Sequence, residues 1–345
     1  MSLVILLLVV VGTLVLVRLM SVLQLANKLT GNEEGDVTDK ENNTNAILMM
    51  VFLVVGMVFV IYTTWKYDQF TLPISASEHG TIVDNLMTIN WYILGIVFFL
   101  TQIALFYFAF KFKYNKNRRA DYYAHNDKLE ILWTIIPAIV LAFLVITGLR
   151  AWGNIMDIET QEGTIIEVYG KQFDWTVRYA GPDNILGKSD VEFISSDNPL
   201  GVDPSDPNGK DDRIARELYL PKGELINFEF RSQDVIHSAY MPHFRAQMNC
   251  VPGMTTRFNM TPTMSTADMK KETGNDDFRY ILLCNKICGV AHYNMKMELV
   301  VEEKVDFFVW LGGQELVFPK KTEENAATEE EPVKEQEADL VEASL

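Results

Sequence analysis

Two cysteines, a histidine and a methionine lie within one short stretch of this chain, Cys284-Asn-Lys-Ile-Cys288-Gly-Val-Ala-His292-Tyr-Asn-Met295. Thiolate, imidazole and thioether groups together are the ligands of a soft, redox-active metal, above all copper. Cysteines separated by three residues can bend around one point and share bridging sulfurs, and His292 and Met295 follow closely enough to return to that point. A second imidazole, His237, lies upstream in the motif Asp-Val-Ile-His-Ser. The set predicts a copper site.

Two other interpretations of the same residues remain open. A structural disulfide between Cys284 and Cys288 would leave His292 and Met295 without a role. A zinc site would fit the thiols and imidazoles, although zinc rarely takes a methionine ligand. Attachment of a c-type haem is excluded, because it requires C-x-x-C-H with the histidine next to the second cysteine.

The composition narrows the class of protein. The chain has 345 residues, enough for a membrane part and one folded domain, and a formal net charge of −16. Such acidity argues against nucleic acid as a partner and favours basic partners. Three cysteines cannot form a disulfide scaffold, and Cys250, which lies outside the motif, fits a small buried apolar side chain.

Four apolar runs in the first half of the chain are each near the roughly 20 residues that a bilayer requires. They are Leu3–Leu25, which contains Arg18, then Ala46–Thr64, Trp91–Phe110 and Ile131–Trp152. The first run could be a signal peptide, but no small-residue cleavage site follows it, so we expect a retained membrane helix.

The loops between these runs indicate the orientation. The connection at 111–119 is rich in Lys and Arg, and short basic loops stay in the cytoplasm. The loop at 67–90 contains neither residue type. We therefore expect a multi-pass membrane protein with everything after Trp152 on the outer side.

From Thr164 onward the pattern changes to short alternating segments, which are typical of strands. We expect strands at 164–169, 172–179, 217–220, 224–231, 255–260, 278–283, 295–302 and 305–311. Regularly spaced strands without helices predict a β-sandwich or barrel. A Gly-, Pro- and Asp-rich stretch at 181–212 is expected to be a polar, exposed insertion, and the acidic tail at 319–345 is expected to be disordered.

These features together resemble subunit II of haem–copper cytochrome c oxidases, of a bacterial type with two additional N-terminal spans. The likeness rests on the membrane hairpin, the outer β-domain, and the motifs D-V-I-H-S and C-x-x-x-C-x-x-x-H-x-x-M. It runs from about Glu78 to Leu311. The segments 76–80, 129–138 and 251–253 also fit the family.

The resemblance implies transmembrane α-helices followed by an all-β, cupredoxin-like Greek-key sandwich. It divides the chain into two extra helices with an acidic connecting loop (1–66), the membrane hairpin typical of the family (67–152), a periplasmic domain (153–318) and the acidic tail (319–345). It also places the protein in the bacterial inner membrane, in contact with membrane lipid.

The resemblance further implies a binuclear copper centre, CuA. Cys284 and Cys288 would bridge both copper ions. His237 and Met295 would complete one ion, and His292 and the backbone carbonyl of Lys286 would complete the other. The centre would accept electrons from cytochrome c, or from a partner complex that carries haem c, and pass them to haem in subunit I. Oxygen is reduced to water there, so this chain would contain no catalytic residue of its own.

Several positions depart from the family's usual pattern. Lys286 stands where the family usually has Glu, and Asn249 where it usually has Asp, so a magnesium site at the boundary with subunit I is in doubt. Phe173 stands at the position of the Trp usually assigned to the acceptance of electrons, and Trp175 keeps the second aromatic position. Both aromatic residues also fit a simple role in the core. Glu130 fits either a carboxylate at a helix N-terminus or the mouth of a proton path.

Two competing functions differ in their metal content. A quinol oxidase subunit II has the same fold without copper, and the retained metal-binding side chains argue against it. A membrane-anchored copper chaperone or thiol oxidoreductase can also use C-x-x-x-C with a histidine. Such proteins usually have one anchor and alternating helices and strands, whereas this sequence predicts four spans and an all-β domain.

Overall fold

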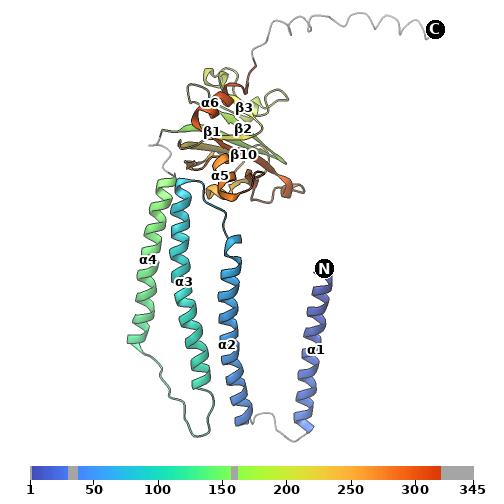
Figure 1. The fold of residues 1–345 in the computed structure, drawn as a ribbon, viewed down its shortest axis with the longest axis vertical. Coiled ribbons are helices and arrows are strands. Elements are labelled where there is room, and N and C mark those ends of the chain that lie inside the picture. Colours follow the sequence, from blue (N-terminus) through green and yellow to red (C-terminus); the bar gives the residue numbers. More distant parts are fainter. Residues whose placement is uncertain (1, 30–37, 157–161, 320–345) are drawn as a thin grey trace, which may run out of the picture. The chain divides into compact units, whose positions relative to one another are not determined.

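The computed structural model describes residues 2–29, 38–156 and 162–319 (Figure 1). It contains four long helices, α1 (Ser2–Leu29), α2 (Asp39–Tyr67), α3 (Glu78–Lys111) and α4 (Asp127–Met156). Each covers one of the four predicted apolar runs and extends beyond it. At the start of α2, Thr38 accepts a hydrogen bond from the Glu41 N–H while the Glu41 carboxylate accepts one from Thr38, which satisfies two N–H groups that a helix start leaves free. A short 3-10 turn, η1 (Asp68–Phe70), follows α2.

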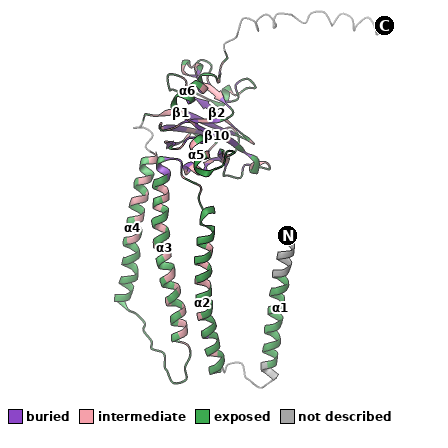
Figure 2. Ribbon diagram, viewed as in Figure 1, coloured by how far each residue is buried: buried purple, intermediate pink, exposed green. Residues whose placement is uncertain are grey.

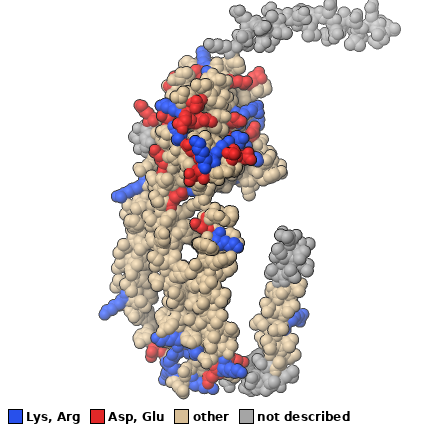
Figure 3. All heavy atoms as spheres, in the orientation of Figure 1, with Lys and Arg blue, Asp and Glu red and all other residues tan. Residues whose placement is uncertain are grey.

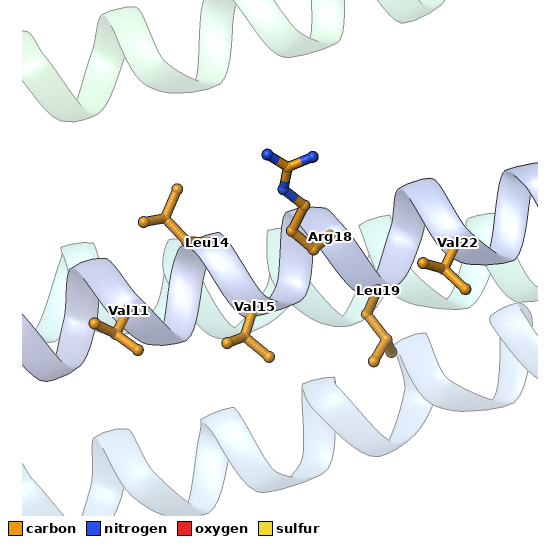
Figure 4. Close-up of a pocket in the computed structure, with 6 residues that line it drawn as sticks. All are labelled: Val11, Leu14, Val15, Arg18, Leu19 and Val22. Carbon is orange, nitrogen blue, oxygen red and sulfur yellow. The ribbon is translucent and has the colours of Figure 1, made fainter.

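Three of these helices, α2, α3 and α4, are long and apolar enough to cross a bilayer. In Figure 2 their surfaces are mostly exposed, as expected for side chains that face lipid. In α1 the described apolar stretch is shorter, Val10–Ala26, so the prediction of a fourth span stays a prediction. Figure 4 shows Arg18 and Leu14 projecting from one side of α1, while Val11, Val15, Leu19 and Val22 point to the other side.

The β-domain is a sandwich of two sheets. The six-stranded sheet has the order β11 (Glu315–Leu316), β3 (Arg213–Ala215), β2 (Asp174–Tyr179), β1 (Thr164–Lys171), β5 (Ile226–Ser232) and β8 (Thr256–Met260). The five-stranded sheet has the order β4 (Leu218–Pro221), β10 (Lys296–Glu302), β9 (Tyr280–Cys284), β6 (His237–Met241) and β7 (Ala246–Cys250). The pairs β1–β5 and β4–β10 are parallel, and the other pairs are antiparallel.

The core of the domain lies between the two sheets, where Figure 2 shows most of the buried residues. Strand β5 illustrates the pattern, because Ile226, Phe228 and Phe230 alternate toward the core and are at most 1% exposed. Trp175 and Tyr179 enter the same core from β2. Full burial of one such side chain stabilises the fold by about 1.5–3 kcal/mol, so the sandwich is a well-packed support for the loops at its ends.

The expectation of strands without helices is wrong in two places. The predicted strand at 305–311 is a helix, α6 (Lys304–Gly312), in which Phe307 and Leu311 are buried while Val305 and Val309 are exposed. This spacing of four residues is that of a helix face. A second helix, α5 (Thr266–Thr273), begins with a capping box between Ser265 and Asp268. The predicted strand list also omitted β3, β6, β7 and β11.

The insertion at 181–212 is exposed for most of its length but is not a free loop. It forms two short 3-10 turns, η2 (Val191–Phe193) and η3 (Pro207–Lys210). Leu200 and Val202 are buried in a small second cluster with Tyr169 and Val317. The predicted exposure is therefore only partly right. The predicted disordered tail lies outside the described residues, apart from its first position.

A buried ionic cluster joins this insertion to the sandwich. Glu167 accepts hydrogen bonds from both Arg178 and Arg231. Arg178 also donates to Asp212 at 2.9 Å, and Arg231 donates to the backbone carbonyl of Leu200 at 2.8 Å. Burial alone would raise the pKa of Glu167, but the two guanidinium groups outweigh it and hold the pKa below its usual range. The cluster therefore needs the ionised carboxylate.

The segment that leads into α3 is fastened to the turn after β6. That turn is η4 (Pro242–Phe244), and its Phe244 carbonyl accepts a hydrogen bond from the Ser77 hydroxyl at 2.7 Å. The next residue, Arg245, donates to both carboxylate oxygens of Asp84 at 2.8 and 2.9 Å. A two-point contact between a guanidinium and a carboxylate is strongly directional. We call this set of contacts the α3 clasp.

Candidate metal centre

His237 opens strand β6, in the five-stranded sheet. It pairs with Cys250 of β7 on one side, and two residues later Ala239 pairs with Cys284 of β9 on the other. The His237 side chain is fully buried, and its ring packs edge-on against Trp175 at 5.9 Å between ring centres. The sheet thus fixes the backbone that carries this imidazole.

Because Gly170 has no side chain, the His237 ring can occupy the space beside it. A Cβ at this position would lie 3.1 Å from His237 Cδ2 and 3.1 Å from the Trp175 ring. Both distances are tighter than ordinary van der Waals contact, so a larger residue would displace the imidazole.

The Asp234 carboxylate orients this imidazole. Asp234 Oδ1 lies 2.9 Å from His237 Nε2, while His237 Nδ1 faces the Cys284 sulfur at 3.9 Å. Burial alone would raise the pKa of Asp234, but hydrogen bonds from the Gln172 N–H and from His237 outweigh it and lower the pKa. An ionised carboxylate is only an acceptor, so we assign the ring proton to Nε2. Nδ1 is then free to bind a metal.

The site has two arms. The first is strand β6 with His237, and the second is the loop from Cys284 to Met295, which we call the thiolate loop. Its neck is closed by two backbone hydrogen bonds, from Cys284 N–H to the Met295 carbonyl at 3.0 Å and from Asn285 N–H to the Ser238 carbonyl at 2.9 Å. Its end is a 3-10 turn, η5 (His292–Asn294). Gly289 permits the backbone shape between them, because its φ of +142° is rare for other residues.

The donor atoms of both arms converge. The two sulfurs of Cys284 and Cys288 are 3.8 Å apart. The Lys286 carbonyl oxygen lies 3.2 Å from the Cys284 sulfur. Around the Cys288 sulfur, His292 Nδ1 lies at 3.6 Å and the Met295 sulfur at 3.7 Å. Each of the six predicted ligand groups therefore has a contact of 3.2–3.9 Å to one of the two cysteine sulfurs, and His237 comes from a strand far from the thiolate loop in the chain.

This geometry fits a soft metal and argues against a disulfide. A disulfide bond is about 2.05 Å long, and both cysteines are free in the structure. The sulfur separation is below twice a typical metal–sulfur bond of about 2.3 Å, so one ion can contact both thiolates. Met295 is 1% exposed, and its sulfur lies 3.7 Å from the Cys288 sulfur. A thioether among the donors favours copper over zinc.

Burial also controls the protonation of the site. Burial, together with the neighbouring Cys284, raises the pKa of the Cys288 thiol to about 11. Without metal this thiol is therefore protonated at neutral pH, and a bound metal must displace its proton. Cys250 is different in kind. It is fully buried behind His237, burial raises its pKa to about 12, and it contributes no donor to the converging set.

The remaining predicted site residues lie in several places. The Lys286 side chain is exposed, so only its carbonyl faces the sulfurs, and Asn249 is exposed on β7. Phe173 is half-buried against Gly289 of the thiolate loop. Trp175 is 1% exposed and touches the site through the His237 ring. The structure therefore brings both aromatic residues to the metal centre and keeps only Phe173 near the surface.

Glu130 lies in the first turn of α4, where its carboxylate is 3.5 Å from the Asn126 N–H. This position suits a carboxylate at a helix N-terminus. It is also the predicted mouth of a proton path, and both interpretations stay predictions.

Two residues of the site were not singled out from the sequence. Asp234 is part of the motif around His237, and its position three residues earlier was the available signal. Gln172 lies 62 residues before Asp234 and 116 residues before Cys288, to both of which it is hydrogen-bonded. No local pattern connects positions so far apart.

Comparison with known proteins places the chain in a family. The profile of "Cytochrome C oxidase subunit II, transmembrane domain" matches residues 66–151, and that of "Cytochrome C oxidase subunit II, periplasmic domain" matches residues 164–304. The alternative cytochrome c oxidase subunit 2 of Bradyrhizobium diazoefficiens is 33% identical over 271 residues, which are 78% of this chain and 91% of that protein.

Two further similar proteins are more distant. Cytochrome c oxidase subunit 2 of Thermostichus vulcanus is 23% identical over 286 residues, which are 75% of this chain and 83% of that protein. The crystal structure of the periplasmic domain of subunit II of cytochrome oxidase of Bradyrhizobium japonicum is 21% identical, with a TM-score of 0.31, and the match covers 45% of this chain and 95% of that one. By its two matching profiles and its Bradyrhizobium diazoefficiens relative, the chain belongs to the cytochrome c oxidase subunit II family and is the electron-accepting subunit of a terminal oxidase, with a transmembrane part and a periplasmic domain.

Proposed function

We propose that this chain accepts electrons at a binuclear copper centre and passes them to haem in subunit I of the same oxidase. The observation that carries the proposal is the convergence of two thiols, two imidazoles, a thioether and a carbonyl within 3.2–3.9 Å contacts. When bound, two copper ions held by these residues would supply a one-electron couple. A donor set of this kind has no evident use in a quinol oxidase.

The residues of the chain have separate tasks in this proposal. Cys284 and Cys288 would hold both metals, as expected from the family. Asp234 keeps His237 in the tautomer that can bind. The sandwich core and the buried ring of Trp175 keep water away from the His237 side. His292 is half-buried, so the thiolate loop reaches closer to solvent than β6 does. A rigid end of a sandwich changes little when the electron arrives, which favours fast transfer.

Electron paramagnetic resonance of the purified oxidase complex, with copper analysis, tests the proposal. One unpaired electron shared by two copper nuclei gives more hyperfine lines than one copper gives alone. We expect such a signal with two copper ions in this subunit. A single-copper signal would favour a chaperone or an isolated copper site, and the absence of copper would favour a quinol oxidase or a thiol oxidoreductase.

The donor is proposed to be a basic cytochrome c or a haem-c-bearing partner complex. The insertion at 181–212 contains eight carboxylates against two lysines, whereas the thiolate loop contains Lys286 and no carboxylate. In Figure 3 acidic and basic groups gather on the β-domain, while the helices are mostly uncharged along their length on the face shown. Turnover with a soluble basic donor should fall as salt rises, because screening acts over roughly 8 Å at physiological ionic strength. Turnover that is independent of salt would favour a donor held in a membrane complex.

The protein is proposed to lie in the inner membrane of a bacterium. Its boundary with subunit I is proposed to lack a magnesium ion. Magnesium prefers oxygen ligands, usually one or two carboxylates, and the Lys286 and Asn249 side chains supply no carboxylate. The exposed Lys286 ammonium has the charge to replace the ion and pair with acceptors of subunit I. A stoichiometric Mn²⁺ signal beside residue 286 after growth in manganese would contradict this proposal.

A further inference from the structure

Gln172 occupies the turn between β1 and β2, and this turn lies against the thiolate loop. The Gln172 side-chain amide donates a hydrogen bond to the backbone carbonyl of Cys288. The next side chain, Phe173, lies so close to Gly289 that a Cβ on Gly289 would come within 2.8 Å of the ring. Two consecutive residues of one strand turn therefore contact two consecutive residues of the loop that carries the thiolates.

The same residue also contacts the other arm of the site. The Gln172 backbone N–H donates to Asp234 Oδ2 at 2.8 Å, while Asp234 Oδ1 faces His237 Nε2 at 2.9 Å. Gln172 thus touches the His237 arm through its main chain and the Cys288 arm through its side chain. Within the described part of the chain, no other residue hydrogen-bonds to both arms in this way.

The thiolate loop has few other attachments near Cys288. Its neck bonds lie at Cys284 and Asn285, and the bonds near its end are within the loop itself. Among the described residues, the Cys288 carbonyl accepts a hydrogen bond from Gln172 alone. The side chains on either side of Cys288 are open to solvent, since Ile287 is 87% and Val290 is 93% exposed. Without the Gln172 amide, the described residues leave this part of the loop with packing contacts, those of Phe173 and of the buried Cys288 side chain, but with no hydrogen bond to the Cys288 carbonyl.

We propose that Gln172 is a positioning residue for the copper centre, which holds Cys288 at its bridging distance from Cys284 before copper binds. The inference rests on the proposed function. The physical reason is that a ligand held in place by hydrogen bonds loses little freedom on metal binding. Groups that orient metal ligands in this way typically contribute about 10–100-fold to metal affinity. The side chain, rather than the main chain, carries this role, so substitution leaves the bond to Asp234 in place.

The test compares Gln172→Leu with Gln314→Leu in the intact oxidase. Leucine is similar in size to glutamine but has no donor. Gln314 is the matched control, because its side-chain amide also donates to a backbone carbonyl, that of Trp310 at 3.1 Å, and neither residue belongs to the thiolate loop or to β6. The two variants therefore lose the same kind of bond, and only one of them loses it at the thiolate loop.

Each variant is compared with wild type in two measurements. The first is the rate of copper loss to a chelator, which we expect to rise at least about tenfold in Gln172→Leu and to stay at the wild-type value in Gln314→Leu. The second is amide hydrogen exchange of the copper-free protein, in which we expect faster exchange within 285–291 in Gln172→Leu only. The second readout does not depend on loaded copper or on turnover.

The outcomes separate the inference from the proposed function. Equal copper loss and equal loop exchange in wild type and Gln172→Leu would overturn the role of Gln172, even if the binuclear signal is present. Equal effects of both variants would also overturn it, because the loss would then reflect general stability. If the wild-type complex has no binuclear copper signal, the proposed function fails, and the exchange of the copper-free loop still decides whether Gln172 holds it.

Discussion

The two arms of the metal centre are held by different kinds of structure. His237 lies in a strand with hydrogen-bonded neighbours on both sides, and its side chain is fully buried. The thiolate loop has two bonds at its neck, the Gln172 contact beside Cys288, and three side chains that are at least 87% exposed, those of Ile287, Val290 and Tyr293. The strand therefore supplies a fixed position for one candidate ligand, and the loop carries the other candidate ligands to it.

The largest expected effect on the copper signal comes from substitution of Cys284, one of the two expected bridging thiols. Cys284→Ser should abolish the binuclear copper signal rather than halve it, because each sulfur is expected to contact both metals. Electron paramagnetic resonance of the purified complex measures this. Cys250→Ser is the control, since Cys250 is a buried thiol of the same sheet outside the donor set. A binuclear signal that survives in Cys284→Ser would refute the assignment of this residue as a bridge.

Removal of copper should change the hydrogen exchange of the two arms by different amounts. Without metal, amides of the thiolate loop between 286 and 291 should exchange about tenfold faster, because ligand binding raises the free energy of local opening. Amides of β6 should change by less than about twofold, because the sheet holds them without metal. Hydrogen exchange resolved by mass spectrometry measures both. Equal acceleration in the two arms would mean that the strand supplies no fixed position.

A smaller effect is expected at the strand arm from Asp234→Asn. The substitution keeps the size of the side chain but removes a negative charge beside His237. That negative charge favours the more positive, oxidised centre, so its removal favours the reduced centre. We therefore expect the midpoint potential to rise by about 50 mV, equivalent to about 1 kcal/mol for one electron. A redox titration followed by visible absorption measures it. A fall in potential would contradict the electrostatic reasoning.

The smallest effect on the copper spectrum should come from Lys286→Met. Only the backbone carbonyl of Lys286 faces the sulfurs, and the side chain is exposed. The spectrum should therefore stay nearly unchanged, while transfer to haem slows or the contact with subunit I loosens. Flash-induced electron transfer and co-purification of the subunits measure these two results. A large change in the spectrum would show that the side chain, and not only the carbonyl, shapes the loop.

The convergence of the candidate site residues was predictable because soft donors are rare and cluster within one short stretch, while their role as metal ligands stays a prediction. The strands were predictable where apolar residues alternate, as in β1 and β5. Alternation failed at 305–311, where a short apolar run fits a strand and a helix equally well, and the spacing of Phe307 and Leu311 decides for the helix only once burial is known. Gln172 was not predictable, because its role depends on a turn and a loop that are neighbours only in the folded sandwich.

The α3 clasp gives strand β6 a second use, as a spacer. His237 stands at one end of β6, and the other end leads directly through η4 to Arg245, which binds Asp84 in α3. A strand rises about 3.3 Å per residue, so the five residues of β6 cover only about 13 Å between the first and the last Cα. The rate of electron transfer falls steeply with distance. The length of one short strand therefore sets the distance between His237, a candidate metal ligand, and the start of helix α3, and insertion of a single residue into β6 would increase that distance.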